Sequence, residues 1–338
     1  DVVTDNNLLR QRYENNELGG ANLLMVTTSA QGVELSLPSG VPLKVLEQNR
    51  TVTVNASGGD FTTVQDAISY AQSVVRPQNA KLIIEVDDGT WNIPTTLSAG
   101  VTGNNFLVTG KNTYAKSLTS IQSSSGAAGA WTLVLNLNNV ANIAVNDYVV
   151  IDTTSGGALP SYIRGVFKIA AVDAINSRIT VTSTHKASTA PSGAVIGTAT
   201  ILKTIFNFTG GGTGFEVWDA SFLAIADVAL VGTAGGDGIS VQDLSRLLCT
   251  GVVGLVGWRN GLLVIESGNA VIGNLSVSGC TTAGTSAANC SSINIYHGNL
   301  CGNVTGSITD RTSNMTMGGN STVSGNTTGI YAKNNSFF

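Results

Sequence analysis

The second part of the sequence repeats itself about every 23 residues, and this repeat restricts the possible folds more than any other feature. Glycine-led segments with a short apolar strand recur at offsets of 24 and 23 residues, as Gly214-Phe215-Glu216-Val217-Trp218-Asp219, Gly238-Ile239-Ser240-Val241-Gln242-Asp243 and Gly261-Leu262-Leu263-Val264-Ile265-Glu266. Each unit holds two or three short strands separated by Gly, Asn or Asp, without a helical period. This pattern predicts the coils of a right-handed parallel β-helix, stacked at about 4.8 Å.

The alignment extends through the second half of each unit. It places Ile225 on Cys249 and Ile272, and Val228 on Val252 and Leu275. We therefore expect these positions to form inward-facing columns along the helix axis.

Two further units follow toward the C-terminus. A fourth unit aligns Gly268-Asn269 with Gly298-Asn299 and Ile272-Gly273-Asn274 with Cys301-Gly302-Asn303, at an offset of about 30. That offset requires an insertion between Cys280 and Cys290, and it places Cys301 with Cys249 in the inward column as a buried thiol. A fifth unit places Met315 and Met317 on Ile293 and Ile295.

The composition agrees with a stacked all-β fold and excludes several classes of protein. Only 11% of the residues are charged, against roughly 25% in an average soluble domain, while 42% are hydrophobic. Such a chain is not disordered, and its 40 glycines follow no collagen period. A net charge of −4 without a basic run argues against nucleic acid, and no long apolar window predicts membrane insertion. Asn, Ser and Thr replace the charges, so we expect neutral polar partners.

The order of patterns along the chain predicts four parts. Residues 1–54 form an N-terminal stem or connector with a short helix over 5–16, and the chain, which begins at Asp1, reads as a processed or shortened form. Residues 55–130 contain a capping helix over 62–75, with a capping-box spacing between Thr62 and Gln65, and the first coils. Residues 131–204 alternate apolar and polar and predict an inserted antiparallel β-domain. Residues 205–338 carry the repeats.

The opening of the predicted helix resembles a known family. Ala56-Ser57-Gly58-Gly59-Asp60-Phe61-Thr62-Thr63-Val64-Gln65-Asp66-Ala67-Ile68, with Ile84-Glu85-Val86-Asp87-Asp88-Gly89-Thr90-Trp91, resembles the start of pectin-lyase-like β-helix proteins. Pectin methylesterases in this group carry a helix over the first coil. Their catalytic aspartates lie in Asp-Phe-Ile-Phe-Gly motifs, and the chain has none, so no esterase residue is carried over.

A second resemblance is to bacteriophage tailspikes and tail fibres. The pattern Leu8-Leu9-Arg10-Gln11 through Gly19–Val26, followed by Gly59-Asp60-Phe61, looks like their stem-to-spike transition. The segments Val145–Ile151 and Gly165–Ile169 resemble a small β-domain inserted in such spikes. The resemblance implies a homotrimeric, extracellular virion protein that joins other tail proteins and contacts a bacterial surface polysaccharide, either capsule or lipopolysaccharide.

Three acidic residues occupy the same place in successive repeats and are the catalytic candidates. They are Asp219, Asp243 and Glu266. Stacked carboxylates perturb each other's pKa, which general acid–base chemistry exploits. The alternative is that each caps the turn after its strand by accepting backbone N–H bonds.

Trp218, Trp258 and Arg259 are the candidates for ligand binding. Indole faces stack on sugar rings, and a guanidinium bonds hydroxyls or carboxylates. Alternation points Trp218 outward, next to the inward Val217. The alternative is that these side chains are buried against a loop or a neighbouring subunit.

The remaining chemistry-bearing residues predict no cofactor and no metal site. His185 and His297 are the two histidines and lack metal-type spacing, and no Cys/His set has zinc spacing. We expect both histidines in loops or at the surface. Cys280 and Cys290 are compatible with a disulfide or with two free thiols.

Together these observations favour a phage tailspike or fibre that recognises a bacterial surface polysaccharide. Two other functions stay open, a polysaccharide depolymerase (glycosidase or lyase) and a purely structural part of the virion. Whether the protein is an enzyme is therefore undecided from the sequence. Release of oligosaccharides would identify the enzyme, and binding without release would identify the receptor-binding protein.

Overall fold

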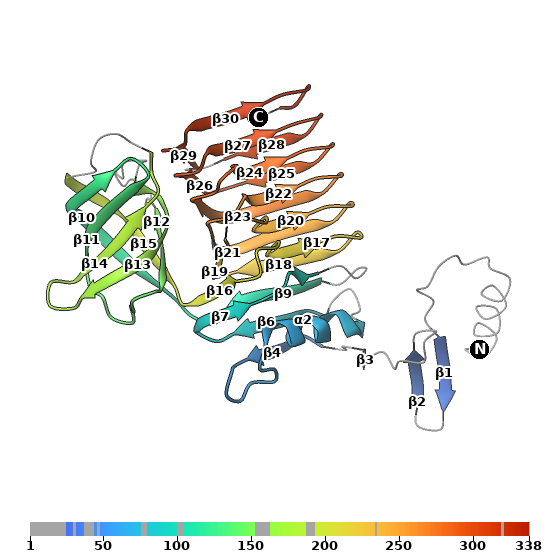
Figure 1. The fold of residues 1–338 in the computed structure, drawn as a ribbon. Coiled ribbons are helices and arrows are strands. Elements are labelled where there is room, and N and C mark those ends of the chain that lie inside the picture. Colours follow the sequence, from blue (N-terminus) through green and yellow to red (C-terminus); the bar gives the residue numbers. More distant parts are fainter. Residues whose placement is uncertain are drawn as a thin grey trace.

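The chain folds into a stack of parallel coils with a closed β-barrel beside it (Figure 1). The structure is a computed structural model that describes residues 25–29, 32–36, 44–45, 48–75, 80–99, 105–152, 163–186, 193–233, 235–318 and 321–337. The expected helix over residues 5–16 lies outside this part. Two short elements precede the coils, the hairpin of β1 (Met25–Ser29) with β2 (Gly32–Ser36), and β3 (Lys44–Val45), which pairs with β5 (Val74–Val75).

Each coil contributes strands to three faces. The first face contains β8 (Leu97–Ser98), β17 (Phe215–Val217), β20 (Ile239–Val241), β22 (Asn260–Val264), β24 (Ala283–Ala287), β27 (Thr305–Thr309) and β30 (Thr328–Ala332). The second face contains β4 (Arg50–Val54), β6 (Leu82–Val86), β9 (Asn105–Gly110), β18 (Phe222–Ala226), β25 (Ser292–Ile295), β28 (Asn314–Met317) and the first halves of β21 (Arg246–Val256) and β23 (Asn269–Ser278). The third face contains β7 (Gly89–Ile93), β16 (Thr204–Phe208), β19 (Val228–Val231), β26 (Gly298–Cys301), β29 (Thr322–Ser324) and the second halves of β21 and β23. All of these strands pair in parallel with their neighbours in the stack, so the predicted parallel β-helix is confirmed.

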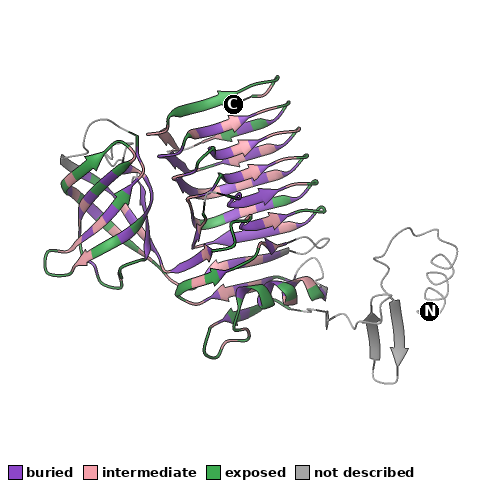
Figure 2. Cartoon of the chain, in the orientation of Figure 1, coloured by how far each residue is buried: buried purple, intermediate pink, exposed green. Residues whose placement is uncertain are grey.

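The predicted inward column is confirmed in the first repeats and at the end of the chain. Ile225, Cys249 and Ile272 pair in successive coils and are buried in one core, and Met315 pairs with Ile293. Apolar side chains of all coils meet there, and Figure 2 shows the buried residues running through the stack. Burial of this continuous column supplies the hydrophobic free energy that holds the coils together.

The predicted register of the fourth unit is wrong. Asn269 pairs with Ser292, an offset of 23 residues, so no loop is inserted between Cys280 and Cys290, and β24 lies there as an ordinary strand. Cys301 pairs with Ser278 on the third face and points away from the column of Ile272. The equivalent of Val228 is Val253, because β21 has an irregularity between Cys249 and Val252.

The capping helix is present one residue later than its predicted cap. Helix α2 (Val64–Ser73) begins after Thr63, whose hydroxyl oxygen accepts from the backbone N–H of Asp66 at 3.1 Å. Its apolar residues, Val64, Ala67, Ile68 and Ala71, are buried against the first coils. The helix contacts β4, β6 and β8 and thereby covers the end of the stack.

The inserted β-domain is a closed six-stranded barrel that begins earlier than residue 131. It consists of β10 (Thr113–Ala127), β11 (Ala130–Leu137), β12 (Tyr148–Asp152), β13 (Gly165–Asp173), β14 (Arg178–Ser183) and β15 (Gly193–Leu202), paired in the order β10-β11-β14-β13-β12-β15. Antiparallel pairing of β10 with β15 closes it. Leu133, Leu135, Ile179 and Val181 lie in its own core.

No helix in the described part of the chain is long and apolar enough to span a membrane.

Candidate functional site

The three acidic candidates lie on the corner between the first and the second face. Asp219, Asp243 and Glu266 have φ values of 60, 53 and 55°, and the residue after each of them is also left-handed. Backbone bonds link the corners of successive coils, since Ala220 N donates to Asp243 O at 2.9 Å and Leu244 N to Glu266 O at 3.3 Å. The structure therefore brings the three residues together in one column, with their side chains exposed.

The carboxylates themselves do not cap this turn. No hydrogen bond to any of the three occurs within the described part of the chain. In several coils, a buried serine follows this corner. Ser221 N, for example, donates to Ser245 Oγ of the next coil at 3.1 Å. Because backbone and serine groups satisfy the corner, the carboxylates are available to a ligand or to water.

The acidic run is confined to three coils. The same corner position is occupied farther along by Asn289, Arg311 and Asn334, which have φ values of 57, 53 and 53°. Arg311 donates to Asn289 Oδ1 at 3.1 Å across two neighbouring coils. The corner thus changes from negative to neutral and basic along the stack, and only its first part can act as a pair of carboxylates.

Trp218 lies at the edge of this corner and is exposed, as alternation predicted. Its side chain retains 40% of its accessible surface, and its indole Nε1 donates to Ser98 Oγ at 2.8 Å in the preceding coil. This bond fixes the ring orientation while one part of the ring stays in contact with solvent. An indole held in this way is suited to stacking on a sugar.

Trp258, by contrast, presents no ring to solvent, and its assignment as a stacking residue is corrected. It is 1% exposed and packs edge-on against Phe208 at 5.4 Å in the coil core. The ring fits because Gly232 has no side chain: a Cβ there would lie 2.4 Å from the indole. Trp258 is a core residue of the corner between the third and the first face.

Arg259 is half exposed, but its guanidinium is engaged by a buried partner. Nε and Nη2 donate to the two carboxylate oxygens of Asp237 at 3.1 and 2.6 Å, and Asn260 Nδ2 donates to the same carboxylate at 2.8 Å. The bond to Asp237 raises the pKa of Arg259 above its usual value. A bidentate pair with a buried carboxylate fixes the corner, so Arg259 has fewer donors for a ligand than the sequence implied.

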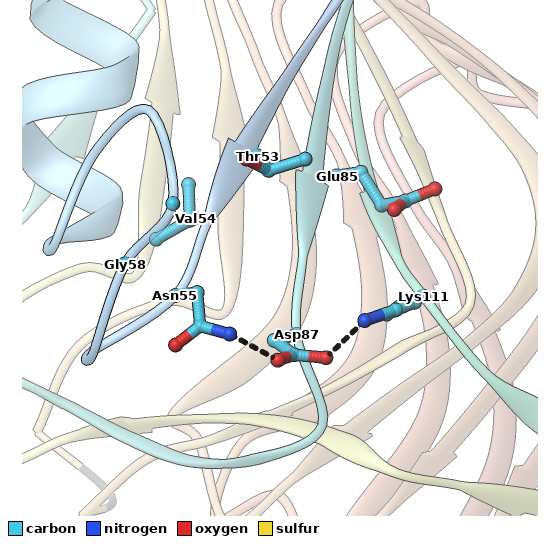
Figure 3. Close-up of a pocket in the computed structure, with 8 residues that line it drawn as sticks. Thr53, Val54, Asn55, Gly58, Glu85, Asp87 and Lys111 are labelled. Atoms are coloured by element: carbon cyan, nitrogen blue, oxygen red, sulfur yellow. Dashed lines mark hydrogen bonds and ion pairs between the residues drawn. The ribbon is translucent and has the colours of Figure 1, made fainter.

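A hollow near the first coils was not predicted from the sequence. It has a volume of about 180 Å³ and is lined by Thr53, Val54, Asn55, Gly58, Gly59, Glu85, Asp87 and Lys111 (Figure 3). Asp87 lies at its centre, accepting from Asn55 Nδ2 at 2.6 Å and from Lys111 Nζ at 2.9 Å. The bond from Lys111 holds the pKa of Asp87 below its usual value. The sequence signal was the Asp87-Asp88-Gly89 segment, which had indicated only the resemblance to pectin-lyase-like proteins.

The four cysteines are free thiols. Cys280 is buried and Cys290 is exposed at the corner, where its sulfur lies 3.1 Å from Thr312 Oγ1, so the open choice between a disulfide and free thiols is answered by two thiols. Burial raises the pKa of Cys280 to about 12. The described residues contain no group of three or more His, Cys, Asp and Glu side chains that could hold a metal ion.

The solved structures that are similar to this chain include a glycoside hydrolase and a phage tailspike. No protein-family model and no curated protein matches the sequence. A glycoside hydrolase matches at 9% identity and a TM-score of 0.28, over 79% of this chain and 87% of its own. The tailspike protein gp49 of Pseudomonas phage LKA1 matches at 13% identity and a TM-score of 0.24, over 75% of this chain and 55% of its own. The pairing of the strands shows by itself that the chain is an all-β parallel β-helix with an inserted barrel, the fold expected from its resemblance to tailspikes.

Proposed function

We propose that the protein is a tailspike or tail fibre of a phage that recognises a bacterial surface polysaccharide along its coils. The observation that carries this proposal is the exposed, hydrogen-bonded indole of Trp218 beside a column of unpartnered carboxylates. An indole face and acceptor groups in a row are what the rings and hydroxyl groups of a glycan bind.

The shape of the molecule supports a long ligand. The hollow around Asp87 has about 180 Å³, whereas sites for small molecules typically have ~300–1,000 Å³. A polymer that follows the surface needs no deep cavity. In its later coils the second face offers neutral polar side chains at the spacing of the coils, where Asn294 pairs with Thr316.

The proposal includes assembly as a homotrimer on the virion, joined to other tail proteins and exposed outside the cell. Identical elongated chains with neutral faces satisfy one another in closed cyclic symmetry. Light scattering of the intact chain should then give three times 34.6 kDa.

A depolymerase is the second candidate, and one observation favours it. Asp219 and Asp243 lie in adjacent coils, whose spacing of about 4.8 Å is close to the ~5–5.5 Å between the carboxyl groups of retaining glycosidases. Asp219 and Glu266 are two coils apart, about 9.6 Å, near the upper limit for inverting enzymes.

The experiment that tests the proposal measures binding and cleavage in the same samples. The full chain and its Trp218→Ala variant are incubated with purified capsular polysaccharides and lipopolysaccharides, and bound polymer and released oligosaccharides are quantified. If the protein is a receptor-binding protein, the parent chain should bind the polysaccharide without cutting it, and the Trp218→Ala variant should no longer bind it. Ile175→Ala is the matched control, because Ile175 is 95% exposed on a barrel hairpin, far in sequence from the acidic column.

A further inference from the structure

The barrel contacts the third face through two chemically different zones. The first zone is apolar: Tyr148, Val150, Val166 and Leu202 of the barrel side pack with Ile205 and Ala229 of the coils. Both chain connections of the barrel belong to this end, because β10 follows β9 and β15 leads directly into β16. Figure 1 shows the barrel beside the later coils and connected to the stack near β16. We call this zone the root of the barrel.

The second zone is polar and lies against later coils. Arg164 Nη1 donates to Thr322 Oγ1 at 2.5 Å, and Lys186 N donates to Gly325 O at 2.8 Å. The carboxylate of Asp152, at the end of β12, forms an ion pair with His297 Nε2, between β25 and β26. Each of these contacts joins the barrel to the coils, and we call this zone the distal contact.

Both histidines of the chain lie in the distal contact. His297 comes from the coils and faces the barrel. His185 comes from the barrel and is 5% exposed against Gly325, where a Cβ would lie only 2.1 Å from the imidazole. A coil surface and a barrel surface therefore meet across the two side chains whose ordinary pKa lies nearest to neutral pH.

We propose that the barrel is a hinged module. His185 and His297 hold it against the coils at the distal contact, and it turns about its apolar root when either histidine changes charge. The root keeps its contacts because none of its six side chains titrates near neutral pH. The distal contact loses its ion pair or gains a buried charge, and either change favours separation.

The two histidines respond to pH in opposite directions. The hydrogen bond to Asp152 raises the pKa of His297. The free energy that His297 contributes to docking, that is, to holding the barrel against the coils, is therefore complete below the ordinary pKa of 6.5 and is lost as pH rises through the raised pKa. Burial lowers the pKa of His185 to about 4, so its cost appears as pH falls below 6.5 toward that value. Docking is thus strongest near the ordinary histidine pKa and weakens on both sides.

The other charged and titratable groups at His297 do not change this prediction. Arg164 opposes the positive charge of His297, but the bond to Asp152 is the larger effect. Cys301 lies nearby, and burial raises its pKa to about 11. For His185, burial is the cause of its shift, and Lys186 beside it is exposed to solvent.

Cys301 is a built-in reporter of the distal contact. Its side chain points from the third face toward the barrel, 3.6 Å from the position of a Cβ on Gly165, and it is 2% exposed. Movement of the barrel away from the coils exposes this thiol, whereas Cys249 and Cys280 stay in the coil core unless the whole fold is lost. Cys290 is exposed and serves as the reference thiol within the same chain.

The test measures the rate at which 4,4′-dithiodipyridine labels Cys301, divided by the rate for Cys290, in the full chain from about pH 5 to about pH 9. We expect a minimum near the ordinary histidine pKa and a rise of several-fold on each side. Asp152→Asn and His297→Gln should each keep the ratio of the two labelling rates high from the ordinary histidine pKa upward, so that no further rise occurs at alkaline pH. The double variant should behave like either single variant. His185→Gln should remove the acid rise.

Lys333→Gln is the control, because it breaks an ion pair with Asp310 on another corner of the stack and should leave the profile unchanged. A ratio that stays constant over the whole pH range overturns the proposal. So does a pH profile that Asp152→Asn and His185→Gln leave as it is in the parent chain. Labelling of Cys249 or Cys280 at the same rate as Cys301 identifies global unfolding and likewise overturns it.

Discussion

The indole of Trp258 and the side-chain amide of Asn303 perform the same task in different coils. Trp258 Nε1 donates to Leu230 O at 3.1 Å, and Asn303 Nδ2 donates to Val277 O at 3.1 Å, in each case one coil back on the third face. Asn326 Nδ2 repeats this bond to Leu300 O at 2.7 Å. In these three coils an indole or an amide at one position of the corner therefore supplies a side-chain N–H group, whereas Cys280 occupies the same position in the coil between Trp258 and Asn303.

Trp258→Phe should therefore destabilise the fold. The substitution leaves Leu230 O buried without its donor, which costs about 1–3 kcal/mol, and it adds a small cavity. A urea midpoint measured for Trp258→Phe should fall clearly, while Trp218→Phe should change stability by less than about 0.5 kcal/mol. Equal midpoints for the two variants would show that the bond of Trp258 contributes nothing.

Leu244→Asn should stabilise the protein. Leu244 has φ 61° and is 69% exposed, so it is strained and gains little from burial. Asn adopts this conformation more readily and occupies a comparable corner at Asn335, with φ 60°. The free energy of unfolding should rise by up to about 1 kcal/mol, measured by the urea midpoint, and a decrease would show that the leucine makes a contact that matters.

Cys249→Ser should be costly and Cys249→Val nearly neutral. Cys249 is 1% exposed between Ile225 and Ile272, so a serine buries a hydroxyl among apolar groups at a cost of on the order of 1–3 kcal/mol. Thermal unfolding of the two variants separates them by several degrees. Similar melting temperatures would place this side chain outside the apolar column.

Asp219→Asn and Asp243→Asn should leave the melting temperature almost unchanged. Asparagine tolerates the left-handed backbone, and the carboxylates make no bond that the substitution would break. Retained glycan binding without any cleavage in parent and variants supports the receptor-binding protein. Cleavage that is present in the parent and absent from the equally stable variants would instead establish these residues as catalytic.

The repeat of short strands made the fold predictable, because Ile225, Cys249 and Ile272 recur at the coil length and share an environment. The register of the fourth coil was not predictable in the same way. Gly268-Asn269 and Gly298-Asn299 look alike, yet Asn269 begins a strand on the second face and Gly298 one on the third. Dipeptides that suit any corner of the coil do not identify which corner they occupy.

The start of the barrel was not predicted because β10 lacks a clear alternation of apolar and polar residues. Of its 15 residues, Leu118 and Ile121 are buried, and serine and threonine fill most of the others. The two tryptophans illustrate the same limit at the candidate site. Trp218 and Trp258 both follow short apolar strands, and the glycines around the Trp258 ring, Gly232 above all, leave the space in which that ring is buried.

The most direct test of the account is equilibrium binding of the full chain to a panel of purified capsular polysaccharides and lipopolysaccharides, measured by interferometry. The parent and Ile175→Ala should bind the same polysaccharide with equal affinity, and Trp218→Ala should weaken that binding by about tenfold or more, as is typical of a tryptophan that becomes covered when its partner binds. Affinity that Trp218→Ala leaves unchanged, or the absence of binding across the whole panel, would contradict polysaccharide recognition on this surface.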